Sequence, residues 1–467
     1  MEQKDINAIV ALAKRRGFIF PSSEIYGGIS NAFDYGPLGV EMKNNIKNEW
    51  WKMFVRKRQN IVGLDASIIM NPKVWEASGH VAEFSDPLVE DVKTHKRYRL
   101  DHLLEEHDID ITGMGIDEMS AVIEERGIKS PDGNALTNAR HFNLLFQTHI
   151  GTTEETMSTV YLRPETAQAM FVDFKNIVSS SRVSLPFGVA QIGKAFRNEI
   201  TPRNFIFRTR EFEQMEIEYF VRASEWEEHF EEWLQEMDAW IQRLGLKKTR
   251  IHRAEIPEGE RAHYSQRTVD IEYDFPFGRK ELYGLAYRGD YDLQQHASHS
   301  NETLVIVDAQ TNEKVVPHTI EPTFGVERTL LAVLVDGYTE EVLENDTRIV
   351  LKIAPWLSPY TVAVFPLVAN DSQMRQKATT LWGSLSGSYS AFYDQSGAIG
   401  KRYRRQDEIG TPLCVTIDGD SLQDDTATLR DRDSMEQVRV QCSDISRCIH
   451  DVLQGLSFAD IQSRYSV

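Results

Sequence analysis

At 467 residues, the chain is longer than one hydrophobic core usually supports, so we expect two or three domains. A hydrophobic content of 41% and an aromatic content of 10% exclude an intrinsically disordered chain. The formal net charge of -19 argues against unspecific binding of DNA, although local basic runs can still contact RNA.

Targeting and redox features indicate a soluble, cytoplasmic protein that makes no membrane contact. The first residues, "MEQKDINAIVALAKRRGFIF", carry early acidic groups and only a short apolar run, unlike a signal peptide. The apolar run "TLLAVLV" is too short to cross a bilayer. Cys414, Cys442 and Cys448 occur without a CxxC pair, which fits a reducing compartment and predicts no zinc site.

The N-terminal third predicts a long helix, a strand and a peripheral piece. Residues 37–58, "PLGVEMKNNIKNEWWKMFVRKR", place a proline before an apolar stripe with a period of about four. The stripe consists of Leu38, Met42, Ile46, Trp50 and Phe54, widened by Val40, Trp51 and Met53. The next segment, residues 61–80, predicts a strand that ends at Pro72. The polar residues 107–140, with "GIKSPDGN", predict an inserted or peripheral piece.

A second amphipathic helix is predicted for residues 224–244. Its apolar face consists of Trp226, Phe230, Trp233, Met237, Trp240 and Leu244. Ser224 and Glu227 fit a capping box, and Gly245 fits a helix end. Aromatic residues on such a stripe are usually core, so we assign them to packing. Residues 268–294 then predict an antiparallel strand pair around "PFGRK".

The chain changes character after "APWLSPY", which has the composition of a linker. Strands and helices alternate beyond it, starting with "YTVAVFPLV" and including a hairpin through "LRDRDSMEQVRV". This alternation favours a separate α/β domain with a parallel or mixed sheet. We therefore divide the chain into residues 1–354 and 355–467. The common phosphate-binding and hydrolase motifs (Walker A, GxGxxG, HExxH, GxSxG) do not occur.

Residues 195–220, "AFRNEITPRNFIFRTREFEQMEIEYF", predict two strands that carry charges among their aromatic residues. Because side chains alternate along a strand, Met215, Ile217 and Tyr219 share one face. The opposite face carries Phe212, Gln214, Glu216 and Glu218. In the first strand, Phe196 and Asn198 oppose Arg197 and Glu199.

This polar face has two interpretations. It is either a solvent-exposed face with cross-strand ion pairs or the floor of a cleft for a charged, planar ligand. In the second case arginines hold phosphate oxygens, Phe212 stacks on a base and Glu216 holds an ammonium group. ATP beside an amino acid would use all of these groups.

Two further stretches favour the cleft. "HTIEPTFGVERTLLAVL" places Glu321 and Arg328 around Gly325, just before an apolar helix. Arg328 falls in the first turn, where the helix dipole disfavours a cation unless it has a partner such as phosphate. "VYLRPETAQAMF" places Glu165 after Pro164, at the opening of another helix.

These stretches resemble the motifs of class II aminoacyl-tRNA synthetases. "FRNE…RTREF" is similar to their motif 2 and "GVER" to their motif 3, while the helix and strand up to Pro72 suit motif 1. "YLRPETAQ", "GLAYRGDYDL" and "EPTFGVER" resemble the dimeric type of the glycyl-tRNA synthetase family over nearly the whole chain. The resemblance implies an α+β catalytic domain with a mixed, mainly antiparallel sheet flanked by helices, and a C-terminal α/β anticodon-binding domain. It also implies a homodimer.

The resemblance further implies that the enzyme joins glycine to tRNA(Gly) with ATP and Mg²⁺. Arg197 is expected at the α-phosphate, Glu199 at the adenine amino group, and Phe212 and Arg328 on the two faces of adenine. The full ATP set is Arg197, Asn198, Glu199, Phe207, Arg208, Arg210, Phe212, Glu281, Leu282, Gly325, Val326, Glu327 and Arg328. Glu281 also matches the magnesium position.

The glycine site implied by the resemblance centres on Glu165, Glu216 and Glu321 around the ammonium group. Its full set is Arg99, Glu165, Phe212, Glu213, Gln214, Met215, Glu216, Glu321, Pro322, Thr323, Phe324 and Gly325. Glycine offers no side chain, so several carboxylates around one small cation and a wall at Cα suit its selection. Relatives often have serine where this chain has Thr323, whose extra methyl group predicts retained or tighter exclusion of alanine. Some relatives also carry a CxxC pair before "RYRL", and its absence here predicts no zinc.

Basic residues of the C-terminal domain are candidates for tRNA contact. "GKRYRRQ" is the densest basic run, and "LRDRDS" lies in a predicted hairpin. The candidates are Arg402, Arg404, Arg430 and Arg432, whereas Tyr403 can instead be core. A solvated helix face is the alternative for the first run. Two other functions are disfavoured. The intact Arg197, Glu199 and Arg328 argue against a non-catalytic relative that binds tRNA or protein. Crowded carboxylates without an apolar or zinc-based side-chain pocket argue against a synthetase for another small amino acid, such as proline, threonine or serine.

Overall fold

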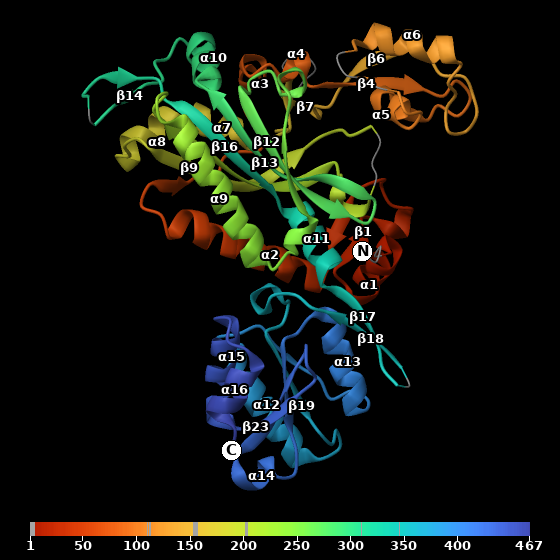
Figure 1. The fold of residues 1–467 in the computed structure, drawn as a ribbon, viewed down its shortest axis with the longest axis vertical. Helices are drawn as coiled ribbons and strands as arrows, with labels where there is room; N and C mark the ends of the chain where they lie inside the picture. The colour runs from red at the N-terminus through yellow and green to blue at the C-terminus, as the bar shows by residue number, and fades with distance from the viewer. Residues whose placement is uncertain are drawn as a thin grey trace.

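The computed structural model describes residues 5–109, 111, 114–152, 157–200, 204–309, 311–344 and 346–467. Figure 1 shows a larger body around a broad sheet, a smaller body at the C-terminal end and a peripheral piece around α5 and α6. Among the described residues, no helix is both long and apolar enough to span a bilayer.

The larger body is built on a seven-stranded sheet with the strand order β11-β12-β13-β16-β10-β9-β3. Every neighbouring pair is antiparallel except β3 and β9, which run parallel. The sheet is therefore mixed and mainly antiparallel, as predicted. Its strands are β3 (Ile61–Gly63), β9 (Phe187–Phe196), β10 (Glu211–Val221), β11 (Ile251–Glu255), β12 (Arg267–Phe275), β13 (Gly278–Gly289) and β16 (His318–Gly325).

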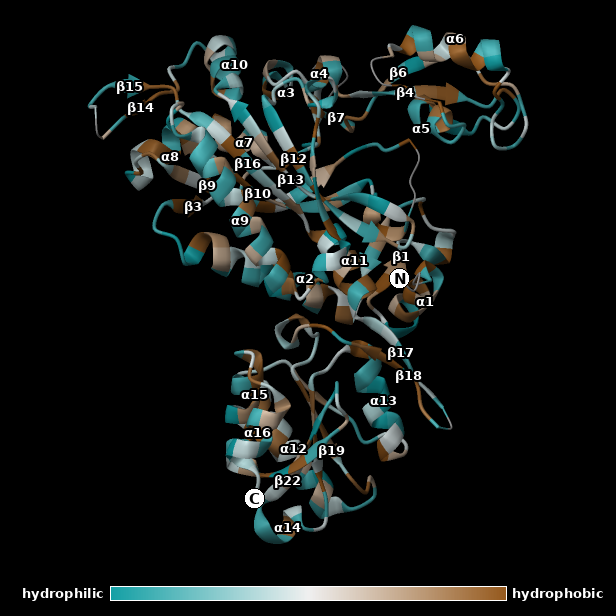
Figure 2. Ribbon diagram, viewed as in Figure 1, coloured by the Kyte–Doolittle hydropathy of each residue, from teal (hydrophilic) through white to brown (hydrophobic). Residues whose placement is uncertain are grey.

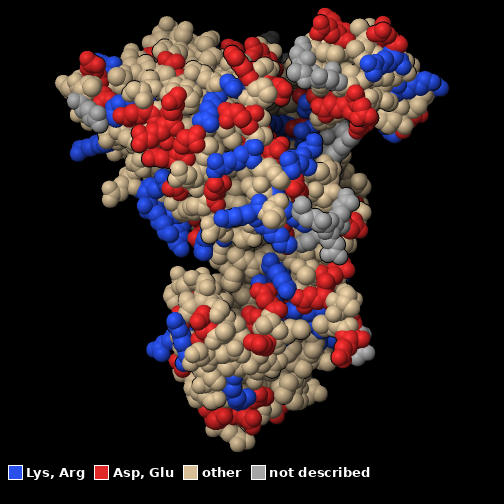
Figure 3. All heavy atoms as spheres, in the orientation of Figure 1, with Lys and Arg blue, Asp and Glu red and all other residues tan. Residues whose placement is uncertain are grey.

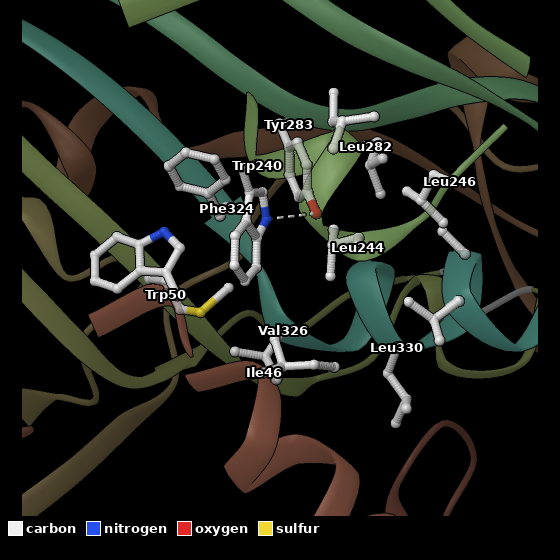
Figure 4. Close-up of a cluster of buried hydrophobic side chains, with 14 of the residues drawn as sticks. Ile46, Trp50, Trp240, Leu244, Leu246, Leu282, Tyr283, Phe324, Val326 and Leu330 are labelled. Atoms are coloured by element: carbon white, nitrogen blue, oxygen red, sulfur yellow. Dashed lines mark hydrogen bonds between the residues drawn. The ribbon is translucent and has the colours of Figure 1, made fainter. Parts of the chain in front are cut away.

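Four helices cover the apolar face of this sheet: α1 (Ile6–Arg16), α2 (Pro37–Trp51), α9 (Trp226–Leu244) and α11 (Val326–Gly337). Figure 4 shows how Trp50 of α2, Trp240 of α9 and Phe324 of β16 meet in this core. Trp240 donates a hydrogen bond to the Tyr283 hydroxyl at 3.2 Å, so the indole N–H of this core residue is satisfied. This packing gives the opposite sheet face a rigid support.

Helices cover the opposite face of the sheet at one end. There α7 (Ala167–Val172), α8 (Phe174–Ser181) and α10 (Tyr291–Ser300) pack against Phe187, Val189 and Phe220. Smaller pairs surround the sheet: β1 (Ile19–Pro21) with β2 (Phe33–Tyr35), β7 (Gln147–Ile150) with β8 (Ser158–Tyr161), and β14 (Ile306–Val307) with β15 (Lys314–Val315). The rest of the face remains available for a ligand.

The helices are amphipathic, as Figure 2 shows by their mixed teal and brown sides. The stripe of α2 is buried as predicted, although Val40 is 42% exposed and does not belong to it. A π-helical turn, Lys52–Arg56, extends α2 and buries Phe54. The apolar stripe of α9 is also confirmed, and Figure 3 shows acidic side chains gathered over its outer side.

Two local predictions were wrong. Pro72 does not end a strand but starts α3 (Pro72–Ala77), because β3 stops at Gly63. Helix α9 has no capping box, since Glu225 is its N-cap residue and makes no side-chain capping bond. Gly245 ends this helix in the left-handed conformation, as predicted.

The peripheral piece is larger than residues 107–140 and has its own small core. It contains β4 (Ser85–Glu90), β5 (Arg97–Arg99), α5 (Leu100–Glu105), α6 (Ile116–Arg126) and β6 (Arg140–Asn143). Val89, Leu104 and Ile123 are buried within it. The polar sequence of residues 107–140 concealed α6, because only one side of a peripheral helix is buried.

The smaller body is a five-stranded sheet with the order β20-β19-β21-β22-β23. Strands β20, β19 and β21 run parallel, whereas β22 pairs antiparallel with β21 and β23 pairs antiparallel with β22. The predicted α/β pattern with a mixed sheet is therefore confirmed. The strands are β19 (Val362–Pro366), β20 (Ala391–Tyr393), β21 (Leu413–Ile417), β22 (Thr426–Asp431) and β23 (Gln437–Gln441). The helices are α12 (Ser372–Ser386), α13 (Ile399–Ile409), α14 (Ser421–Asp424), α15 (Ile445–Leu453) and α16 (Phe458–Tyr465).

A hairpin, β17 (Tyr338–Val342) and β18 (Thr347–Leu351), joins the two bodies. Arg348 of this hairpin is fully buried, and its Nε lies 2.9 Å from Oδ2 of Asp407 on α13. Arg16 of α1 reaches Glu408 on the same helix at 2.5 Å. Charged contacts therefore attach α13 to the larger body at two points.

Candidate active site

Two adjoining cavities lie on the polar face of the large sheet. The arginine cavity, of about 370 Å³, is lined by Arg99, Arg197, Arg208, Arg328, Phe207 and Phe212, among others. The glutamate cavity, of about 340 Å³, is lined by Glu165, Glu216, Glu321 and Tyr264, among others. Arg197, Gln214, Glu281 and Thr323 line both cavities, so ligands in the two cavities can touch.

Strand β10 and helix α11 supply opposite parts of the arginine cavity. Phe212 stands near the start of β10 and Arg328 in the first turn of α11, and these positions are brought together because Gln214 pairs with Gly325. The Arg328 guanidinium carbon lies 4.6 Å from the ring centre of Phe207. The cavity therefore combines planar rings with planar cations.

Arg197 lies just beyond the end of β9, not inside a strand as predicted, and so do Asn198 and Glu199. Its Nε donates to the Pro164 carbonyl at 3.0 Å, and its guanidinium carbon is 5.3 Å from the Phe212 ring centre. These contacts hold the guanidinium at the border of the two cavities.

Carboxylates accompany the arginines of this cavity. Oε2 of Glu281 lies 3.0 Å from Nη1 of Arg328, and this cation lowers the pKa of Glu281. Burial raises the pKa of Asp86 to about 6, although Arg99 stands 2.8 Å away and opposes the shift. Arg99 therefore reaches the cavity from the peripheral piece with its charge already partly balanced.

The glutamate cavity brings together three carboxylates from separate segments. Glu216 of β10 accepts a hydrogen bond from Thr323 at 2.9 Å, and Glu321 stands on the neighbouring strand β16. Glu165 precedes α7, and its Oε2 lies 3.4 Å from Nε2 of His80. All three glutamates are buried, with 1–7% of their surface exposed. The structure thus brings these three predicted residues together at one place.

Arg288, the buried arginine in this group, was not among the residues predicted for the site. Arg288 is fully buried and donates to Glu321 at 2.9 Å and to Asp292 at 2.7 and 2.8 Å. Its guanidinium carbon lies 3.7 Å from the ring centre of Tyr264. The available signal was an arginine inside the otherwise apolar strand "GLAYRG". Such a residue needs buried partners.

Carboxylates outnumber the cationic side chains in this cluster. Burial opposes ionisation of Glu165, but the charges of His80 and Arg288 outweigh this and lower its pKa. For Glu216, burial and the nearby Glu165 raise the pKa. Burial also raises the pKa of Glu321 well above its usual value, with Arg288 opposing and the other glutamates adding to the shift. A cation that enters the cavity supplies the missing positive charge.

A fourth glutamate lies deeper on the same face. Glu218 is fully buried, and neither of its carboxyl oxygens has a hydrogen-bond partner among the residues that the structure describes. One oxygen each of Glu216, Glu218 and Glu321 lie within 4.8 Å of one another. Burial, and then the charge of Glu321, raise the pKa of Glu218 well above its usual value.

Several predicted site residues face the other way, because neighbours along a strand point to opposite faces. Met215 and Phe324 are fully buried in the apolar core, and alternation directs Pro322 to the same side as Phe324. Val326 is also core. The Glu213 carboxylate binds Lys43 at 2.6 Å, on the face that α2 covers. Their assignments to the glycine or ATP site are corrected accordingly.

The remaining predicted ATP residues divide into two groups. Glu199, Arg208, Leu282, Gly325 and Glu327 line the arginine cavity, although the Glu327 carboxylate binds Lys43. Asn198 and Arg210 do not line it. Arg210 instead donates to the Ser30 carbonyl at 2.9 Å. This bond attaches the loop between β1 and β2 to the rim of the site.

Comparison with known proteins identifies the family. Residues 148–336 match the family model described as tRNA synthetase class II core domain (G, H, P, S and T), and residues 361–451 match the model described as Anticodon binding domain. A glycine–tRNA ligase of Caldanaerobacter subterraneus is 50% identical over 457 residues, which cover 96% of this chain and 98% of the relative. The chain belongs to the glycine–tRNA ligase family.

Two other glycine–tRNA ligases are similar over nearly their whole length. The protein of Alkaliphilus oremlandii is 50% identical over 461 residues, covering 97% of this chain and 99% of the relative. The protein of Bacillus anthracis is 48% identical over 454 residues, covering 96% and 98%. As a member of this family, the chain is a class II aminoacyl-tRNA synthetase that uses ATP to attach glycine to tRNA(Gly) in two steps.

Three of the four arginines predicted to contact tRNA are buried in the smaller body of this ligase. Arg402, Arg430 and Arg432 are 1–4% exposed. Arg430 binds Asp407 at 2.9 Å, whereas Arg432 donates to the carbonyls of Gly410 and Ile353 at 2.8 Å each. Arg402 donates to the Pro366 carbonyl at 2.5 Å. These guanidinium groups satisfy buried acceptors and cannot meet RNA, so the prediction was wrong for all three.

Tyr403 packs against the core of this body, which was the alternative interpretation of the basic run. Arg404 differs from the three buried arginines, because 34% of its side chain is exposed. Lys401 is exposed as well. The basic run "GKRYRRQ" therefore contains both a buried, structural arginine and exposed cations.

Proposed function

We propose that the arginine cavity binds ATP, that the glutamate cavity binds glycine, and that their common wall holds the reacting atoms. The observation that carries this assignment is the set of four residues, Arg197 among them, that line both cavities. An adenylate requires an amino acid's carboxylate to meet the α-phosphate, and only adjoining sites allow this.

In this arrangement, Arg197 holds the α-phosphate at the border of the cavities. Phe212 stacks on one face of adenine, and Arg328 lies against the other while reaching the γ-phosphate. Glu199 accepts a hydrogen bond from the adenine amino group. Guanidinium groups match phosphate oxygens in geometry and charge, which supports the roles of Arg197 and Arg328.

Mg²⁺ is proposed to enter with ATP at Glu281. Asp270 lines the glutamate cavity together with Glu281, and burial followed by the charge of Glu281 raises the Asp270 pKa to about 7. Two neighbouring carboxylates, of which Glu281 raises the proton affinity of Asp270, form an oxygen donor set that suits a hard divalent cation. When bound, the ion neutralises charge on the phosphate oxygens.

Glycine is proposed to place its ammonium group among Glu165, Glu216 and Glu321. These carboxylates are positioned by Thr323, Gln168 and Arg288 rather than by water-exposed groups. Thr323 lines both cavities, and its methyl group narrows the space beside the glycine α-carbon. Arg99 contacts the substrates from the peripheral piece.

The chemistry needs no protein nucleophile. A glycine carboxylate oxygen attacks the α-phosphorus, the bond to the β-phosphate oxygen breaks, and pyrophosphate leaves. The terminal ribose hydroxyl of the tRNA then attacks the carbonyl carbon of the adenylate and releases AMP. The side chains of the two cavities position the reactants and stabilise charge.

Further parts of the proposal concern the whole protein. Residues 1–354 form the catalytic domain and residues 355–467 the anticodon-binding domain, in which Arg404 contacts tRNA. The protein acts as a cytoplasmic homodimer and requires no zinc. The family's dimeric type supports the homodimer; the apolar face of α2 packs within this chain and gives no support for it.

The test is ATP–pyrophosphate exchange with purified protein, Mg²⁺ and single amino acids. We expect exchange with glycine alone and its loss in the Arg197→Ala variant. Exchange supported by another amino acid would show that the glutamate cavity was misassigned. Full activity of Arg197→Ala would show that Arg197, at the border of the two cavities, takes no part in the reaction.

A further inference from the structure

A buried ion cluster lies directly behind the wall of the arginine cavity. Lys43 of α2 is 7% exposed, and its Nζ stands 2.6 Å from Oε2 of Glu213 and 2.6 Å from Oε1 of Glu327. The same Nζ lies 3.9 Å from the ring centre of Tyr35. We call Lys43, Glu213 and Glu327 the lysine cluster.

The lysine cluster joins the two elements that carry Phe212 and Arg328. Glu213 follows Phe212 on β10, and Glu327 precedes Arg328 in the first turn of α11. The backbone N–H of Glu213 also donates to Oε2 of Glu327 at 2.9 Å. The Lys43 ammonium group therefore links β10, which carries Phe212, to α11, which carries Arg328.

The charge balance of the cluster depends on Lys43. Burial disfavours the ammonium form, but the charges of Glu327 and Glu213 outweigh burial and raise the Lys43 pKa, so the residue stays charged. Lys47 reaches Glu213 at 3.0 Å but is 24% exposed at its side chain. Without Lys43, Glu327 would face Glu213 across the wall with like charge, which is costly in a buried place.

Phe212 has room to move if Lys43 no longer links β10 to α11. A cavity of about 330 Å³ adjoins the cluster and is lined by Phe212, Lys43, Glu213 and Glu327. Phe212 and Glu327 line both this space and the arginine cavity, so they form part of the wall between the two. The space beside Phe212 leaves room for a displacement of its ring away from a nucleotide base.

We propose that Lys43 is a positioning residue that sets the separation of Phe212 and Arg328 and thereby the affinity of the arginine cavity for a planar purine base. This inference rests on the proposed ATP site. Stacking depends steeply on ring separation, and displacements of about 1 Å in an active site can cost about 10²-fold in rate. Because Lys43 belongs to α2, that helix sets the geometry of the nucleotide site without touching the nucleotide.

The test compares Lys43→Met with Lys47→Met in ATP–pyrophosphate exchange. Lys47 is the matched control because it lies one turn further along α2 and binds Glu213 but not Glu327. For Lys43→Met we expect KM for ATP to rise at least about ten-fold, with KM for glycine changed less than about three-fold. Lys47→Met should leave both values near those of the original protein, and Lys43→Arg should recover much of the ATP affinity.

Two further variants separate this inference from folding effects and from the ATP site itself. The triple variant Lys43→Met, Glu213→Gln, Glu327→Gln removes the like charges, and we expect it to regain ATP affinity relative to Lys43→Met. Phe212→Ala tests the ATP site, because an unchanged KM for ATP there would overturn the proposed function as well. If Phe212→Ala weakens ATP binding while Lys43→Met does not, or if Lys43→Met weakens ATP and glycine equally, the positioning role is wrong.

Discussion

Replacing Glu216 with glutamine tests the glutamate cavity most directly. Glu216 is 1% exposed, and its Oε1 accepts a hydrogen bond from Thr323 at 2.9 Å. Glutamine keeps the shape of the side chain and one acceptor oxygen but removes the negative charge. The variant therefore isolates the ionic part of the interaction with the glycine ammonium group.

The size of the effect follows from the environment of Glu216. A hydrogen bond that involves a charged group contributes about 1.5–3 kcal/mol, and little solvent screens this buried position. The loss corresponds to a decrease of about 10- to 150-fold in kcat/KM for glycine. KM for ATP should stay unchanged, because Glu216 lines only the glutamate cavity.

The assay is glycine-dependent ATP–pyrophosphate exchange at saturating ATP. Glu218→Gln is the matched control, since Glu218 lies two residues along the same face, is equally buried and lines neither cavity. We expect kcat/KM for glycine in this control within about three-fold of the original protein. Equal losses in both variants would mean that the whole sheet face responds to lost charge, and the reasoning about a specific ammonium site would fail.

Two other predictions concern selectivity and pH. Thr323→Ser keeps the hydroxyl that binds Glu216 but removes a methyl group beside the glycine α-carbon, so the preference for glycine over alanine should fall by about 10-fold in exchange assays; unchanged selectivity would contradict this. Glu218 has a pKa raised above its ordinary value of 4.5, so the unfolded chain releases this proton first as pH rises. Stability attributable to Glu218 therefore decreases above about pH 4.5, and Glu218→Gln should raise Tm more at pH 8 than at pH 5. A Tm difference independent of pH would show that the buried carboxyl does not titrate as stated.

Local periodicity in the sequence was sufficient to predict the main supports of the site. The four-residue apolar stripes of α2 and α9 and the alternation along β10 each identify a buried side, because helix and strand geometry alone decide which residues share a face. The polar face with Gln214 and Glu216, the apolar face with Met215 and the helix that begins after Gly325 were predicted in this way and are found in the structure.

Residue-by-residue transfer from family motifs was less accurate than this alternation. The motif ranges placed Glu213, Met215 and Phe324 in the glycine site, although the strand period already directs them to the opposite face. A contiguous motif range assigns every residue of a strand segment to the site, although successive side chains of a strand point to opposite faces.

Only the tertiary structure decided which charges face a ligand and which are structural. Arg288, Arg402 and Arg432 look alike in the sequence as isolated or clustered cations, yet each is buried against at least one carboxylate or carbonyl that lies far away along the chain. The sequence by itself determined the periods that orient side chains and the motifs that mark the family. It did not determine these partners, because a buried charge is stabilised by groups that long-range packing brings within about 3 Å, and no local pattern records that approach.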